Sequence, residues 1–229
     1  MAEQPRRQVM VILAHPDDPE FGCGGSIAKW TAEGYEVRYA LCTSGDKGSW
    51  DPAVSPGAMA ALREQEQAEA ARELGVVECL FLRHVDGELE PTLALRREIA
   101  LLLRQFKPEI VVSHDPYLHY QIHPDHRAVG TVVMDAIAGA RDIWYFPEQL
   151  GNGVGAHRVK ELYLTRPQEP NYWVDISSTF ERKIAALRKH ESQVNRIGDL
   201  RERMHRLAEA AGRAAGVPLA EAFHRLELT

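Results

Sequence analysis

Short runs of apolar residues alternate with amphipathic stretches along most of the chain. Each run is followed within a few residues by glycine, aspartate or proline, a pattern typical of strands buried in a parallel sheet. These runs predict strands over 9–13, 36–43, 78–82, 109–115 and 142–146. The stretches between them are predicted as helices over 26–34, 58–74, 91–107 and 128–140.

This alternation of strand and helix predicts an α/β fold. Four strand–helix units closed by a fifth strand imply a doubly wound, mostly parallel sheet with helices on both faces. Beyond these units the pattern loosens, and we expect shorter strands over 158–164 and 172–176 and helices over 180–195 and 200–215. Because no repeat or linker separates the parts, we interpret residues 1–229 as one domain, with a core at 8–146 and a C-terminal extension at 147–229.

Side chains suited to catalysis follow the first and the fourth predicted strand. His15, Asp17 and Asp18 come just after the first strand, and His123 and His126 follow the fourth. In a doubly wound sheet these two strands are neighbours where the strand order reverses, and ligands bind outside their carboxyl ends. We therefore expect the five side chains to meet at one edge of the sheet.

His15, Asp18 and His126 form a candidate metal site. Two imidazoles and one carboxylate suit a divalent cation of borderline softness, Zn²⁺ first and Fe²⁺ second, and three protein ligands leave a position for water, as in catalytic sites. Asp17 is then the candidate general base, and His123 the candidate to polarise a carbonyl or protonate a leaving group. Each motif alone could instead be a turn that caps a helix, but their joint placement at two strand ends favours the metal site.

These motifs resemble those of a known family. The run from His15 to Asp18 with Gly24-Gly25 behind it, together with His123-Pro124-Asp125-His126, is similar to the PIG-L/LmbE-like family of zinc-dependent deacetylases of N-acetylglucosamine-type substrates. The resemblance implies a Rossmann-like fold, a metal held by His15, Asp18 and His126, Asp17 as general base and His123 as electrostatic helper. The commoner family form has Glu directly after the second Asp; here Pro19 intervenes and Glu20 follows, so we assign Glu20 no role.

Further candidates are expected near the same edge. Arg63 and Glu64, early in the second predicted helix, could hold sugar hydroxyls or a substrate anion, or form a solvated helix face. Asp86 follows the third strand and is a candidate substrate-binding residue or a turn-stabilising acid. Asp115 is the candidate to orient a metal-ligating histidine. The likeness of the late helix to that of the family makes His190 a substrate-binding candidate.

Composition narrows the classes of function. The formal net charge is −6 and no basic patch dominates, which argues against nucleic acid or an acidic membrane as the main partner. The cysteines, Cys23, Cys42 and Cys79, are odd in number and widely spaced, so no disulfide framework is expected. No apolar run is long enough for a transmembrane helix and no signal-peptide cleavage pattern is present, so we expect no integral membrane segment and a cytoplasmic location.

The sequence thus predicts a metal-dependent hydrolase that removes an N-acetyl or similar N-acyl group from an amino sugar or its conjugate, a small molecule. Two alternatives stay open. One is an amidase acting on a thiol conjugate or an antibiotic-like amide, a choice that the loop at 46–57 would decide. The other is a non-catalytic metal- or nucleotide-binding module, although Thr43-Ser44 stands where nucleotide binders place an acid. The family resemblance favours a homo-oligomer, with the last helix packing on its own domain or on another subunit.

Overall fold

The structure, a computed structural model, describes residues 7–228. Its strands are β1 (Gln8–Leu13), β2 (Glu36–Thr43), β3 (Glu78–His84), β4 (Ile110–His114), β5 (Glu161–Thr165), β6 (Tyr172–Asp175) and β7 (Ala220–Glu227). Its helices are α1 (Asp18–Ala32), α2 (Pro56–Leu74), α3 (Leu93–Phe106), α4 (Pro124–Ala140), α5 (Phe180–Leu187), α6 (Glu191–Val194) and α7 (Leu200–Ala215), with a 3-10 helix η1 (Pro147–Gln149).

The described strands form a seven-stranded sheet with the order β3-β2-β1-β4-β5-β7-β6. Strands β1 to β5 run parallel, and β7 is antiparallel to both β5 and β6. Val9 of β1 is level with Val37 of β2 on one side and with Ile110 of β4 on the other. The strand order reverses between β1 and β4, which confirms the doubly wound sheet and places the ends of these two strands side by side.

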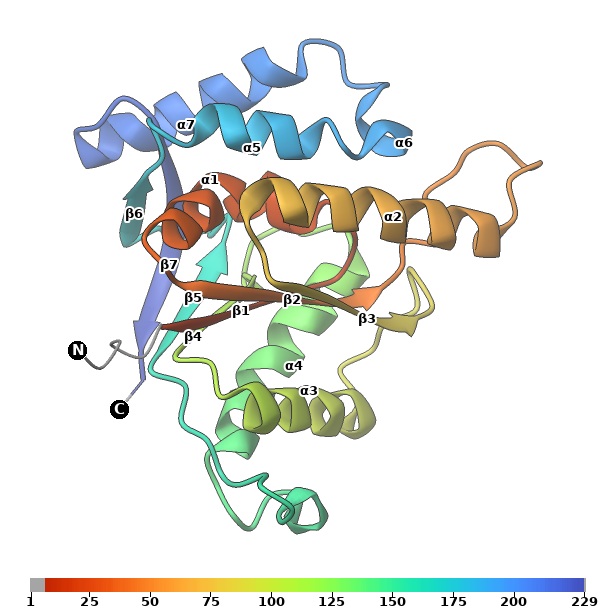
Figure 1. Cartoon of the computed structure of the whole chain (residues 1–229), viewed down its shortest axis with the longest axis vertical. Coiled ribbons are helices and arrows are strands. Elements are labelled where there is room, and N and C mark those ends of the chain that lie inside the picture. Colours follow the sequence, from red (N-terminus) through yellow and green to blue (C-terminus); the bar gives the residue numbers. More distant parts are fainter. Residues whose placement is uncertain (1–6, 229) are drawn as a thin grey trace.

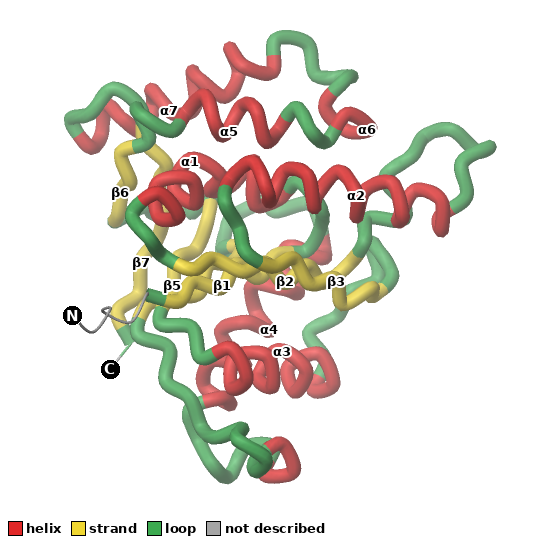
Figure 2. Tube along the Cα trace, viewed as in Figure 1, coloured by secondary structure: helices red, strands yellow, loops and turns green. Residues whose placement is uncertain are grey.

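Helices cover both faces of the sheet. In Figures 1 and 2, α1 and α2 lie on one face with α5, α6 and α7 outside them, and α3 and α4 lie on the other face. Alternate side chains of β1 supply both cores: Val11 and Leu13 pack in the cluster under α1, whereas Met10 and Ile12 pack in the cluster under α3 and α4. The central strands are therefore buried on both faces, and the polar side chains of the candidate site follow the ends of these strands.

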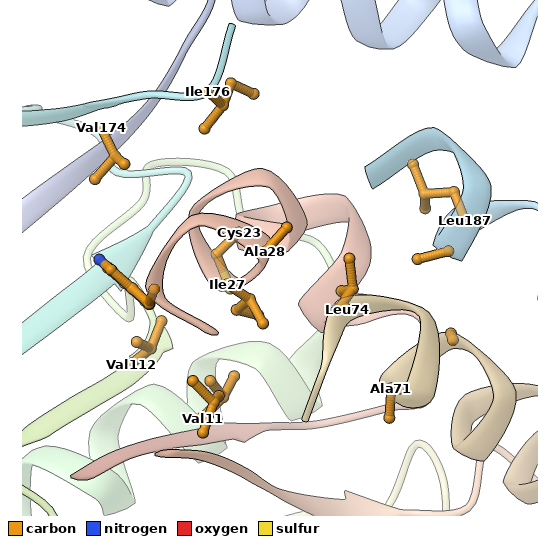
Figure 3. Packing of buried hydrophobic residues seen from close by; sticks show 14 of the residues in the cluster. Val11, Cys23, Ile27, Ala28, Ala71, Leu74, Val112, Val174, Ile176 and Leu187 are labelled. Atoms are coloured by element: carbon orange, nitrogen blue, oxygen red, sulfur yellow. The ribbon is translucent and has the colours of Figure 1, made fainter. Parts of the chain in front are cut away.

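Close packing of α1 on the sheet depends on small residues. Figure 3 shows Val11 of β1 facing Ile27 of α1, with Leu74 of α2 in the same buried cluster. A side chain at Gly25 would not fit, because a Cβ atom there would lie 2.8 Å from the side chain of Ile176. The Gly24-Gly25 pair after the first motif thus lets the start of α1 sit close to its neighbours.

The expected strand over 142–146 is wrong, because these residues form turns that lead into η1. The fifth parallel strand is β5. Two of the apolar side chains that suggested a strand are solvent-facing, with Ile143 52% and Trp144 82% exposed. The buried guanidinium of Arg104 explains the turns, since it donates to the carbonyl oxygens of Gly139, Ala140, Asp142, Tyr145 and Phe146.

Other differences lie in the C-terminal extension and at helix starts. The helix expected over 180–195 breaks at His190 into α5 and α6, and β7 was not expected at all. The extension contributes β5, β6 and β7 to the same sheet as the core; the one-domain organisation stays an interpretation. Helices α1 and α4 begin earlier than expected, at Asp18 and Pro124.

Two expectations from composition can be compared with the structure. The three cysteines are free, as expected, and burial raises the pKa of each thiol, so that they stay protonated. Within residues 7–228 no helix has the length and apolar character needed to cross a membrane.

Candidate metal centre

The carboxyl ends of β1 and β4 carry the candidate ligands. The turn after β1 begins at His15, and the backbone N–H of Asp18 donates to the carbonyl oxygen of His15 at 3.3 Å as α1 begins. Helix α4 begins at Pro124, where the missing N–H is no loss, and this puts His126 in the first turn. The fold thereby brings two imidazoles from positions 111 residues apart into contact.

The three candidate ligands form a triangle of matching dimensions. Nδ1 of His15 lies 3.2 Å from Nε2 of His126 and 3.3 Å from Oδ2 of Asp18, and the same Nε2 lies 3.3 Å from Oδ1 of Asp18. Ligand atoms bound at about 2.0–2.1 Å to a tetrahedral cation lie about 3.3 Å apart. The two imidazole nitrogens therefore have the spacing of two ligands of one zinc-like ion, and each faces its own oxygen of the Asp18 carboxylate. Groups of possible ligands that lie within 4.8 Å of one another include His15, His123 and His126, and Asp18, His114 and His126.

The electrostatics of the triangle also favour a cation. Burial lowers the pKa of His15, but hydrogen bonds to Asp125, Asp18 and Asp86 outweigh it and raise the pKa well above the ordinary value. Burial raises the pKa of Asp18, but the neighbouring imidazoles of His126 and His114 hold it well below the usual range. A cluster of buried carboxylates that stabilises an imidazolium ion stabilises a divalent cation by the same attraction.

Two carboxylates orient His15 from its far side. Its Nε2 lies 3.0 Å from Oδ2 of Asp125 and 3.1 Å from Oδ1 of Asp86. Asp125 is fully buried and also accepts the backbone N–H groups of Gly87 and Leu89, at 2.7 and 3.2 Å. A proton held on Nε2 by these acids leaves Nδ1 free to face a metal, the usual arrangement of a carboxylate behind a ligating histidine.

The carboxylate expected to orient a metal-ligating histidine, Asp115, has different partners. It accepts the backbone N–H groups of Tyr117 and Gln168, both at 2.9 Å. It thereby joins the loop after β4 to the loop after β5. The sequence analysis assigned Asp125 no role, although Asp125 lies inside the second motif, His-Pro-Asp-His, next to a candidate ligand.

Asp17 lies beside the triangle in a strained conformation. Its φ is 89°, in the left-handed region that non-glycine residues rarely adopt. Its Oδ2 accepts from Arg63 at 3.1 Å, and its backbone N–H donates to Oε1 of Gln67 at 2.8 Å. Burial raises the pKa of Asp17 to about 6, against the lowering effect of the Arg63 charge. A carboxylate with this pKa is a competent proton acceptor near neutral pH.

His123 is the residue directly before α4, and its ring contacts two candidate ligands. The ring centroid lies 4.5 Å from that of His15 and 4.8 Å from that of His126. Its Nδ1 is buried and has no hydrogen-bond partner among the described residues. Burial, with the charges of His15 and His126, lowers its pKa, so the ring is neutral and carries one N–H donor.

The candidate substrate residues on α2 already have partners. Arg63 is 4% exposed and donates to the carbonyl oxygens of Pro16 and Gly45 as well as to Asp17, so it holds the first motif and the loop after β2 in place. Glu64 accepts from Arg83 and Ser44, and these hydrogen bonds, chiefly that from Arg83, lower its pKa despite partial burial. It lines an open hollow of about 450 Å³. The remaining candidate, Asp86, adjoins His15 as described above.

His190 belongs to a buried network that reaches Asp17. It is fully buried, and its Nε2 lies 3.2 Å from Glu20. Glu20, also fully buried, accepts from Gln67 at 3.0 Å and from Tyr39 at 3.2 Å. Because Gln67 in turn accepts the N–H of Asp17, the network supports the strained turn. Gln67 was not among the residues predicted for the site, because in the sequence it resembles any polar residue of an exposed helix.

The chain is similar to known deacetylases. The family model described as PIG-L, GlcNAc-PI de-N-acetylase, matches residues 10–137. A diacetylchitobiose deacetylase of Thermococcus kodakarensis is 38% identical over 187 residues, which cover 82% of this chain and 70% of that protein. A 1D-myo-inositol 2-acetamido-2-deoxy-alpha-D-glucopyranoside deacetylase of Saccharomonospora viridis is 32% identical, with 81% of this chain and 85% of that protein covered.

Solved structures also include a similar deacetylase. The N,N'-diacetylchitobiose deacetylase of Pyrococcus horikoshii superimposes with a TM-score of 0.92 and 32% identity, over 96% of this chain and 84% of that one. A structure described as a 4-carboxy-2-hydroxymuconate hydratase, GalB of Pseudomonas putida, has a TM-score of 0.80 but 21% identity, and shows the shared fold alone. The fold is thus compatible with more than one reaction, and the activity must be argued from the site.

Proposed function

This chain belongs to the PIG-L family, and we propose that it is a metal-dependent deacetylase that removes the N-acetyl group from an amino sugar or amino-sugar conjugate. The observation that carries the proposal is the triangle of His15, Asp18 and His126, with Asp17 and His123 on its border. The names of the related deacetylases support the substrate class.

We propose Zn²⁺ as the cation, with Fe²⁺ as the second choice. Two nitrogens and one oxygen suit zinc, and no cysteine belongs to the groups of possible ligands among the described residues, which favours a catalytic site with an open position over a structural one. When bound, such a cation polarises a carbonyl group and lowers the pKa of a water molecule to about 7.

The residues of the chain supply the proton transfers. Asp17 accepts a proton from the water molecule that attacks the amide carbon, and Arg63 holds the accepting carboxylate in place. His123 donates its N–H to the amide oxygen, which becomes negative as the attack proceeds. The amine leaves with the proton that Asp17 returns, because the neutral His123 ring contributes a hydrogen bond and no proton of its own. Acetate and the free amine are the products.

We test the proposal by acetate release from N-acetylglucosamine and N,N'-diacetylchitobiose, after the purified protein is loaded with zinc. Asp17→Asn should keep one metal per chain, because it removes no ligand, and should lose nearly all turnover. Arg141→Gln, at the far end of α4, is the matched control and should leave turnover unchanged. Full turnover by Asp17→Asn would refute the base assignment, and absence of any acetate release by the wild type would refute the substrate class.

Two further proposals concern the setting of the enzyme. The free thiols support a reducing compartment, for which we propose the cytoplasm. The resemblance to the family supports a homo-oligomer, which sedimentation analysis would test.

A further inference from the structure

His114, the last residue of β4, lies against the segments that carry all three candidate ligands. Its Nε2 is 3.2 Å from the backbone nitrogen of Ala14, the residue before His15, and 3.3 Å from Oδ2 of Asp18. Its ring stacks on His126, with centroids 4.0 Å apart and ring planes 13° from parallel. His114 is 7% exposed, so these contacts define its environment.

The contact with Ala14 limits what His114 can do. A backbone amide is a donor only, so Nε2 must accept, and the proton of the neutral ring is then on Nδ1. The lone pair of Nε2 is directed at Ala14 and is not available to a cation. His114 is therefore not suited to be a fourth ligand, although one of its ring nitrogens lies within 4.8 Å of ligand atoms of Asp18 and His126.

The two ligating histidines differ in how they are oriented. Carboxylates hold the far nitrogen of His15, as in most metal-binding histidines. Within the described chain the hydrogen bond and ion pair of His126 both involve Nε2, the nitrogen that faces the metal position. Rotation of the His126 ring is instead restricted by the near-parallel rings of His114 and His123.

We propose that His114 is a positioning residue of the metal centre. Its ring face sets the rotation of His126, and its Nε2 ties the end of β1, where His15 begins the site, to the end of β4. The inference rests on the metal site of the proposed function and extends it to a residue that coordinates nothing.

Three substitutions separate the two contacts. His114→Ala removes both and should weaken zinc binding about 10- to 100-fold, the usual effect of losing a residue that orients a ligand. His114→Phe keeps a flat ring against His126 and should restore most of the affinity, while the unpaired N–H of Ala14 lowers the melting temperature. His114→Asn offers an acceptor to Ala14 without a ring and should restore stability more than affinity.

The readouts are the zinc dissociation constant, measured by competition with a chelator, and the visible spectrum of the cobalt-substituted protein. His157→Ala is the matched control, because His157 is a half-buried histidine bonded to the carbonyl oxygen of Pro108 at the other end of β4. This control should melt earlier than the wild type but bind zinc equally well.

Unchanged zinc affinity in His114→Ala would overturn the inference and leave the proposed function intact. A cobalt spectrum of His114→Phe that reports one nitrogen ligand fewer would also overturn it, since His114 would then be a ligand. If the wild type itself retains no zinc, both the proposed function and the positioning role of His114 are overturned.

Discussion

Replacing Asp125 with Asn tests whether the carboxylates behind His15 control the metal centre. The fully buried side chain of Asp125 accepts three N–H groups: Nε2 of His15 at 3.0 Å, and the backbone of Gly87 and Leu89 at 2.7 and 3.2 Å. Asparagine keeps one carbonyl oxygen but places an NH₂ group where the second oxygen accepted. At least one donor then faces another donor in a buried site.

The expected effects follow from these contacts. A hydrogen bond to a charged group contributes about 1.5–3 kcal/mol, so Asp125→Asn should lower the unfolding free energy by about 3 kcal/mol. His15 also loses the partner that keeps the proton on its far nitrogen. Zinc affinity should therefore fall about 10- to 100-fold, equivalent to about 1.4–2.7 kcal/mol.

Asp115→Asn provides the control, because Asp115 is also buried and also accepts two backbone N–H groups, but has no contact with His15 in the described structure. Both variants should unfold at lower urea concentration. Only Asp125→Asn should lose zinc affinity in a chelator competition assay. Equal losses of affinity in the two variants would show that zinc binding merely follows stability, and the reasoning about His15 would be wrong.

Three further outcomes are expected. Asp17 must be ionised to accept a proton and its buried carboxyl has a pKa of about 6, so kcat/KM should fall as the pH drops through that value. Because the Arg63 charge lowers this pKa, the fall in kcat/KM should occur at a higher pH in Arg63→Gln. Arg104→Met leaves buried carbonyl oxygens without donors and should lower the unfolding free energy in urea by about 3 kcal/mol, with zinc affinity unchanged. Lys183→Met removes the cation that lies 2.6 Å from the buried Glu221 carboxylate and leaves that charge unpaired, although Gly25 and Ser26 still donate to it. This should lower the unfolding free energy in urea by about 3–5 kcal/mol, and adding Glu221→Gln should recover part of the loss.

The central fold could be predicted because its signal is local. Runs such as 9–13 are apolar on both faces of a strand, and helix α2 ends at Gly75, which adopts a left-handed conformation. The strand predicted over 142–146 was wrong because Ile143, Trp144 and Tyr145 are exposed there, and because Arg104, a residue distant in sequence, binds backbone carbonyl oxygens of the segment. Strand β7 was not recognised because Ala220–Glu227 mixes acidic, basic and apolar residues, and its place depends on pairing with β5.

The candidate site could be predicted only as far as its motifs reach. The proximity of His15 and His126 could be predicted because the topology of a doubly wound sheet makes β1 and β4 neighbours. It could not select Asp125 over Asp115 as the acid behind His15, since both follow β4 and the choice depends on which side chain turns inward at the start of α4. Gln67 was also missed, because its burial depends on helix packing.

The commoner family form has Glu directly after the second Asp, and the structure explains why this chain can have Pro19 there and Glu20 one position later. Successive side chains on a helix point about 100° apart, so placing the acid one position later directs it to another face of α1. On that face Glu20 meets Gln67 and His190 in a buried network, and Gln67 accepts the N–H of the strained Asp17. Pro19 is tolerated because first-turn N–H groups have no helical partner. The shifted acid therefore supports Asp17, the proposed general base, through α2, and a chain with Glu at position 19 would need another way to hold Asp17 in its left-handed conformation.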